Sequence, residues 1–94
     1  MLVAIIGFFK PGADLASPSL QRELNEHFGP TPLNLRAAGY LHDPKGRKVG
    51  VMALAEAEDF TLAEAYLQAS PFVRGDLLEW TEIVEYVIEV GRFE

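Results

Sequence analysis

Four segments of the chain have the residue pattern of β-strands. Residues 2–9 are β-branched, aromatic or small and end before Pro11-Gly12, which predicts a first strand. Residues 33–41 alternate loosely, and residues 48–57 form a second extended run. Asp43-Pro44-Lys45-Gly46 between these two runs has the chemistry of a turn and predicts a hairpin.

The last predicted strand covers Thr81 to Val90. Its alternation separates two sets of side chains, because successive residues of a strand point to opposite faces. One face carries Val84, Tyr86, Ile88 and Val90, and the other carries Ile83, Glu85, Val87 and Glu89.

Two segments have the helical period. Ser17 is a good N-cap and Pro18 suits the first helical position, so a helix of about three turns is expected to begin there. Its apolar stripe is formed by Leu20, Leu24, His27 and Phe28, and Gly29-Pro30 ends it. A second helix is expected after Phe60. Its signals are a Thr61/Glu64 capping box, a Phe60–Ala65 staple, a buried stripe of Leu62, Tyr66 and Ala69, and an end at Ser70-Pro71.

The predicted order is therefore β-α-β-β-α-β. Right-handed crossovers assemble this order into an α+β fold of the ferredoxin-like type, with a four-stranded antiparallel sheet and both helices on one face. The strands at residues 2–9 and 49–55 are apolar at both alternating sets of positions, so the helix-free face also needs burial. A homodimer that joins these faces is the simplest answer, and the alternative is a monomer whose bare face binds a ligand.

Length and composition predict one domain over residues 1–94. A chain of 94 residues with 49% apolar content builds one core, and its lack of cysteine excludes disulfides and thiolate metal sites. The apolar run after Met1 has no basic segment before it, is too short to span a bilayer and ends at Lys10-Pro11-Gly12. We therefore expect a cytoplasmic protein without membrane association.

The net charge of −6 is unevenly distributed. Residues 1–55 hold six basic and four acidic side chains, whereas residues 56–94 hold two basic and ten acidic ones. An acidic C-terminal half repels phosphates, so nucleic acid is not an expected partner. The sequence has no glycine-rich phosphate loop and no ligand spacing for a metal, and we therefore expect neither a cofactor nor a metal site.

The segment from Ala37 to Phe72 resembles the YCII-related (YciI-like) family. The resemblance rests on Ala-Ala-Gly-Tyr, the turn His-Asp-Pro-Lys-Gly, the following strand and helix, and Ser-Pro-Phe-Val-Arg, and it continues through Gly75 and residues 83–90. It implies a dimeric α/β barrel. It also implies a site that pairs a histidine on the first helix with an aspartate after the second strand, in an acid–base role.

Candidate catalytic residues follow from this resemblance. Asp43 matches the family's aspartate, but the family's histidine position falls near Arg22, and the histidine of the first helix, His27, lies more than one turn further on. A histidine on an apolar stripe is also typical of a structural residue. His42 is a further candidate, although adjacent strand residues such as His42 and Asp43 point to opposite faces. In a purely structural role, Asp43 would stabilise the hairpin turn and His42 would be an exposed turn residue.

Four residues are candidates for ligand binding. Tyr40 and Phe72 would form apolar walls, and Arg36 or Arg74 would pair with an anion. Their structural alternatives are a strand aromatic, a core residue and exposed surface arginines. Where family members have Asp-Pro-Phe or Asp-Pro-Tyr, this chain has Ser70-Pro71-Phe72, which removes another acid.

Three hypotheses for function remain open at this stage. The first is a small lyase, isomerase or hydrolase that uses Asp43 with His27 or His42 on a lactone-like or aromatic molecule. The second is a non-catalytic module that binds a small apolar acid, and the displaced histidine favours it. The third is an oligomerising subunit whose partner performs the chemistry. Fold resemblance alone does not decide among them.

Overall fold

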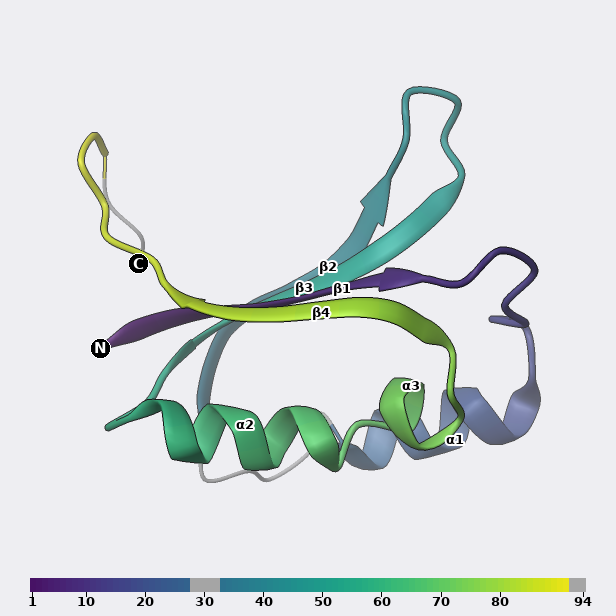
Figure 1. The fold of residues 1–94 in the computed structure, drawn as a ribbon, viewed down its shortest axis with the longest axis horizontal. Coiled ribbons are helices and arrows are strands. Elements are labelled where there is room, and N and C mark those ends of the chain that lie inside the picture. Colours follow the sequence, from purple (N-terminus) through teal and green to yellow (C-terminus); the bar gives the residue numbers. More distant parts are fainter. Residues whose placement is uncertain (28–32, 92–94) are drawn as a thin grey trace.

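The computed structural model describes residues 1–27 and 33–91, and it confirms the predicted fold class. Its elements are β1 (Leu2–Phe9), α1 (Pro18–His27), β2 (Asn34–His42), β3 (Lys48–Glu56), α2 (Phe60–Gln68), α3 (Pro71–Arg74) and β4 (Leu78–Glu85). The four strands form one sheet in the order β2-β3-β1-β4, and every pairing is antiparallel. All three helices lie on the same side of this sheet (Figure 1), which is the ferredoxin-like arrangement.

The first helix begins where the sequence predicts. Pro18 is its first residue, and the Ser17 hydroxyl accepts a hydrogen bond from the Leu20 amide at 3.4 Å. Leu20 and Leu24 are buried, as the predicted stripe requires. The rest of that prediction, Phe28 and the stop at Gly29-Pro30, lies outside the described residues.

The second helix begins earlier than its predicted capping box. Asp59 is the N-cap, and its carboxylate accepts a hydrogen bond from the Leu62 amide at 3.1 Å. Thr61 therefore lies inside the first turn, so the Thr61/Glu64 box and the Phe60 staple are wrong. The buried positions are Ala63 and Leu67, flanked by the partly buried Leu62 and Tyr66, whereas the predicted Ala69 is exposed.

A short helix that the sequence interpretation missed follows α2. The pair Ser70-Pro71 ends α2, but it also starts α3, because Pro71 occupies the first helical position. The Ser70 hydroxyl accepts a hydrogen bond from the Phe72 amide at 3.2 Å and caps the new turn. As a result Phe72 turns into the core, where only 4% of it is exposed.

The last strand covers Leu78–Glu85 instead of the predicted Thr81 to Val90. β4 pairs only with β1, and β1 begins at Leu2. The bond from the Tyr86 amide to the Leu2 carbonyl, at 2.9 Å, is the last connection between the two segments. Beyond it β1 offers no further partner, so the alternation predicted for residues 87–90 does not belong to the sheet.

The core lies between the helices and one face of the sheet. Val3, Ile5, Ala53 and Ala55 pack with Ala63 and Leu67 of α2 in one cluster. A second cluster joins Leu20 and Leu24 of α1 to Phe72, with Phe9, Tyr40, Val51 and Leu78 against it. The register of β2 shifts between Leu35 and Ala37, so Arg36 is the extra residue of a bulge. Leu35 and Tyr40 consequently both face the helices.

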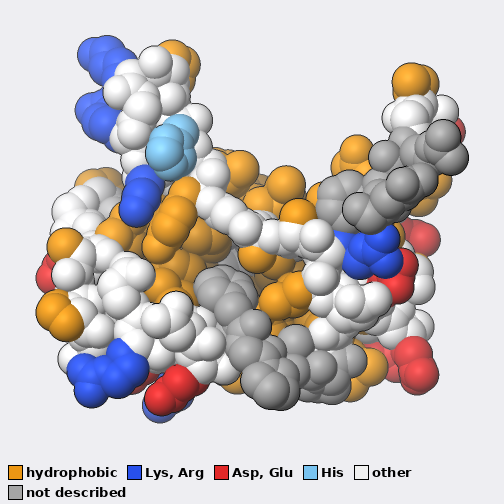
Figure 2. Space-filling view, turned by 180° about the vertical axis from the view of Figure 1, so that it is seen from behind, with side chains coloured by type: hydrophobic (Ala, Val, Ile, Leu, Met, Phe, Trp, Pro, Cys, Tyr) orange, Lys and Arg blue, Asp and Glu red, His pale blue; other side chains and the backbone are white. Residues whose placement is uncertain are grey.

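None of the helices in residues 1–27 and 33–91 lies over the opposite face of the sheet (Figure 1). The strand pairing places Ala4, Ile6 and Phe8 of β1 on this face, together with Met52, Leu54, Trp80 and Val84. Phe8, Trp80 and Val84 are exposed by 37%, 50% and 41%. Figure 2 shows apolar side chains in the notch between two segments that rise from this side, the β2–β3 hairpin and the chain after β4. In the described part of the chain, no helix is long and apolar enough to cross a membrane.

Candidate functional site

A pocket of about 450 Å³ lies between the sheet and the helices. This volume falls within the range of small-molecule sites. Residues from β1, β2, β3, β4, both long helices and α3 surround it: Ile5, Ile6, Gly7, His27, Leu35, Ala38, Gly39, Tyr40, Val51, Met52, Ala53, Tyr66, Leu67, Ser70, Phe72 and Leu78. None of these described lining residues is Asp, Glu, Lys or Arg. The pocket is therefore suited to an apolar molecule with a few polar atoms.

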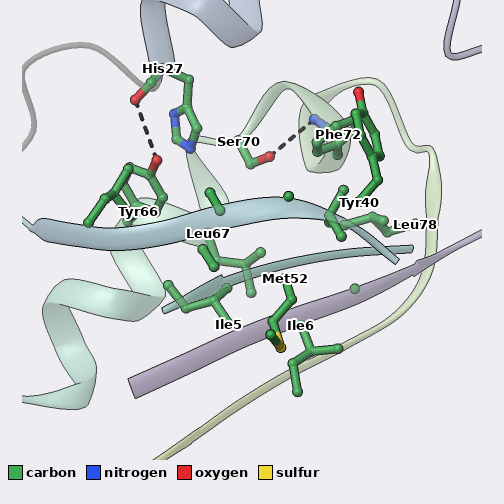
Figure 3. Close-up of a pocket in the computed structure, with 16 residues that line it drawn as sticks. Ile5, Ile6, His27, Tyr40, Met52, Tyr66, Leu67, Ser70, Phe72 and Leu78 are labelled. Atoms are coloured by element: carbon green, nitrogen blue, oxygen red, sulfur yellow. Dashed lines mark hydrogen bonds between the residues drawn. The ribbon is translucent and has the colours of Figure 1, made fainter. Parts of the chain in front are cut away.

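One end of the pocket carries a histidine and a tyrosine in contact (Figure 3). The rings of His27, the last residue of α1, and Tyr66 of α2 stack with centroids 4.1 Å apart and an interplanar angle of 25°. The Tyr66 hydroxyl also donates a hydrogen bond of 3.5 Å to the His27 carbonyl oxygen. Tyr66 thus fixes both the ring and the backbone of His27 from the neighbouring helix.

Burial shifts both groups toward their neutral forms. Desolvation lowers the pKa of His27 below its ordinary value of 6.5, and it raises the pKa of Tyr66 to about 12. At neutral pH the imidazole is therefore uncharged and has a nitrogen lone pair, whereas the phenol keeps its proton. An uncharged imidazole beside an apolar cavity is the form that a general base requires.

The other end of the pocket is aromatic. Phe72 lies against Phe9 with ring centroids 5.3 Å apart, and its centroid is 6.3 Å from that of Tyr40. The Lys48 ammonium sits 4.1 Å from the centre of the Tyr40 ring. The two predicted walls, Tyr40 and Phe72, therefore do line one cavity together with His27.

Asp43 lies elsewhere, at the turn of the β2–β3 hairpin. Its carboxylate accepts hydrogen bonds from the Lys45 and Arg47 amides, each at 2.9 Å, and from the Arg47 Nε at 2.8 Å. The Arg47 backbone bond is the largest cause that lowers the pKa of Asp43. The hairpin rises away from the helices (Figure 1), so the structure does not bring Asp43 to His27. His42, beside it, is exposed.

The two candidate arginines are also outside the pocket lining. Arg36 reaches Glu56 at 3.3 Å across the strand pair, and Arg74 is exposed in the last turn of α3. Their proposed role as anion partners therefore finds no support from the cavity. Within the described segments, no cluster of His, Cys, Asp or Glu could hold a metal ion.

Two polar lining residues, Tyr66 and Ser70, are not among the site residues that the sequence predicts. The sequence places Tyr66 in the buried stripe of the second helix, and a buried phenol needs a polar partner. That requirement was the available signal for a polar site. Ser70 was interpreted as a helix stop, although a serine before proline is equally a helix start.

No family model matches the chain, and no curated protein matches it in sequence. Solved structures that share its fold include the following two. One is 5-chloro-2-hydroxyhydroquinone dehydrochlorinase from Burkholderia phenoliruptrix, in complex with 2,5-dihydroxybenzoquinone. It aligns with a TM-score of 0.78 at 18% identity, over 93% of this chain and 94% of its own.

The second similar structure is a Chloroflexus aurantiacus protein assigned provisionally as an antibiotic biosynthesis monooxygenase. Its TM-score is 0.54 at 17% identity, over 97% of this chain and 98% of its own. At these identities the two likenesses establish the fold, and they leave the chemistry of the pocket to be argued from its residues.

Proposed function

We propose that this chain binds a small oxygen-bearing ring compound in the pocket and that His27 acts on it as a general base. The observation that carries the proposal is the pocket itself: about 450 Å³, with uncharged lining residues and with a neutral imidazole at one end. Apolar walls accept the faces of a ring, and a few polar groups orient its substituents.

The proposed step is a proton transfer. A hydroxyl or acidic C–H of the bound ring gives its proton to a ring nitrogen of His27, and the resulting imidazolium later returns that proton to the product or to water. Tyr66 acts as a positioning residue, because it stacks on the imidazole and bonds to its backbone. Phe72 and Tyr40 hold the opposite edge of the ring.

The comparison with the Burkholderia dehydrochlorinase supports the size and type of the ligand. That protein has the same fold and was solved with 2,5-dihydroxybenzoquinone, a small oxygenated ring. Such a ring is compatible with a cavity of this volume. A lyase, isomerase or hydrolase reaction driven by proton transfer therefore remains our proposed class.

Non-catalytic binding is the second candidate, and the position of Asp43 favours it. The expected acid is held in its own turn by Lys45 and Arg47, so the histidine–aspartate pair implied by the family resemblance does not assemble in this chain. Binding alone would need only the pocket walls.

We also propose that the chain acts as a homodimer joined through the helix-free face. Phe8, Trp80 and Val84 on this face are each exposed by more than a third, and monomeric proteins rarely expose a continuous apolar patch over a whole sheet. A second copy supplies a matching apolar surface.

Binding and catalysis can be tested separately. Hydroquinone, an uncharged probe, is expected to bind at least tenfold tighter by calorimetry than 4-hydroxybenzenesulfonate, because burying an unpaired charge is costly. Ala38→Phe fills the pocket and should abolish binding, whereas Ala65→Phe, on the exposed side of α2, should not.

Turnover distinguishes the two candidates. On any ring substrate found by product analysis, His27→Gln should keep binding within about threefold and lower the rate by about a hundredfold or more. Unchanged turnover in His27→Gln would refute the general base and leave a binding protein. Failure of the wild-type chain to bind any neutral ring probe would overturn the proposed function.

A further inference from the structure

We propose that two copies of this chain associate with unlike ends together, so that the basic hairpin of one copy contacts the acidic C-terminal segment of the other. The hairpin arm is residues 42–48, and the C-terminal arm is residues 86–91. This inference rests on the homodimer proposed above and adds the orientation of the copies and the residues that decide it.

The hairpin arm is positively charged. It holds Lys45, Arg47 and Lys48 against a single acid, Asp43, and all three basic residues are exposed. Arg47 is paired with Asp43 at 2.8 Å, and Lys48 lies over Tyr40. Among the described residues, the Lys45 ammonium makes no ion pair. The arm therefore presents unneutralised positive charge to anything beside it.

The C-terminal arm has the opposite charge. Glu89 is exposed, and it forms no ion pair within residues 1–27 and 33–91. This arm leaves the sheet because β1 begins at Leu2, and it also carries apolar side chains into solvent. Tyr86, Val87 and Val90 are exposed by 49%, 65% and 94%. Such a segment combines charge with an apolar surface that a partner would cover.

The two arms stand at opposite ends of the same face. Both rise from the helix-free side of the sheet in Figure 1, and the apolar notch lies between them in Figure 2. When two such faces meet, the two-fold axis lies in the interface. One choice of axis brings like arms together, and the perpendicular choice brings each hairpin arm to the partner's C-terminal arm.

Charge selects between these choices. Like arms would place lysine beside lysine and glutamate beside glutamate, and like charges across an interface oppose association. Unlike arms place Lys45 near Glu89 of the second copy, twice in each dimer. The apolar notch provides the contact area, and the arms determine the orientation.

Charge reversal in the full-length chain tests the orientation. Sedimentation equilibrium at low salt should show that Lys45→Glu raises the dimer dissociation constant about tenfold, and that Glu89→Lys does the same. The chain with both substitutions should return to within about threefold of wild type, because its arms are again complementary. Raising salt should weaken the wild-type dimer.

Matched controls use exposed charges of the helix layer. Arg22→Glu and Glu23→Lys change the net charge equally and should leave the dissociation constant unchanged. A dimer that is indifferent to the arm reversals, or that tightens with salt, would overturn the proposed orientation and leave the homodimer intact. A wild-type chain that stays monomeric at high concentration would overturn the homodimer itself.

Discussion

The two faces of the sheet contain similar side chains but differ in what covers them. On the helix-covered face Val3 and Ile5 are exposed by 0% and 6%. On the other face Phe8 and Trp80, whose ring centroids lie 5.4 Å apart, are exposed by 37% and 50%. One strand, β1, contributes to both faces. Apolar side chains therefore occur on both faces of this sheet, but the topology places the chain's own helices over only one of them.

The contrast extends to function. The covered face contains the pocket, because three helices enclose it and place His27 over it. The bare face contains no described helix contact and instead has charged arms at its ends. We therefore assign chemistry to the first face and association to the second, and the following substitutions separate the two roles.

The largest effect is expected from Leu24→Ala on the covered side. Leu24 is only 4% exposed and packs against Leu20 and Phe72, so its truncation should lower the free energy of unfolding by about 3 kcal/mol. Val84→Ala on the bare face should cost the monomer less than about 1 kcal/mol and chiefly weaken association. Urea unfolding at two protein concentrations measures both. If the loss of unfolding free energy in Leu24→Ala varied with protein concentration as strongly as that in Val84→Ala, the division of roles between the two faces would be contradicted.

A smaller loss is expected at Gly50 of β3, where the neighbouring strands leave no room for a Cβ. A Cβ added at Gly50 would collide with the Gly7 carbonyl oxygen and would press on the Phe8 and Leu41 side chains. Gly50→Ala should therefore destabilise the fold by about 2 kcal/mol. Gly39, in the adjacent strand, has nothing within 4 Å of such a Cβ, so Gly39→Ala should change stability by less than about 0.5 kcal/mol. Thermal unfolding compares the two variants, and equal losses would refute the assignment.

The smallest expected effect is a pH dependence of the free energy of unfolding that comes from His27 on the helix-covered face. Burial lowers the folded-state pKa of His27 below 6.5, so the unfolded chain binds the proton more readily. The stability that this group contributes is complete above about pH 6.5 and is lost as pH falls through the lower folded value. His27→Gln should flatten this part of the unfolding curve, whereas His42→Gln, at an exposed site, should not. If the pH dependence of stability disappeared in His42→Gln instead, its assignment to the partly buried His27 would be contradicted.

Much of the fold could be predicted because its signals are local. The strand at residues 2–9, the Ser17-Pro18 helix start and the Asp43 turn each depend on a few adjacent residues, and all three are confirmed. The end of β4 could not be predicted in this way, since it depends on where β1 begins. The predicted start of α2 is wrong because Asp59 and Thr61 are both good N-caps, and only the structure distinguishes them.

The candidate site was predicted in part for the same reason. His27, Tyr40 and Phe72 lie on apolar patterns, and those patterns do converge on one cavity. Tyr66 escaped selection because its stacking on His27 joins two helices that are 39 residues apart in sequence at this contact. The proposed catalytic roles of His27, Asp43 and His42 remain predictions for the experiments above.

The extra residue in β2, Arg36, determines which face of the sheet the later residues of the strand point to. Leu35 and Tyr40 would face opposite sides of the sheet if the alternation ran unbroken, and the one-residue bulge brings both to the helix side. Deleting Arg36 would therefore remove the bulge and leave Leu35 and Tyr40 on the helix side, because they would then be four positions apart in a regular strand. Keeping Arg36 but pairing it regularly would instead turn Tyr40 toward the helix-free face, so a one-residue bulge decides on which face of the sheet the aromatic wall of the pocket lies.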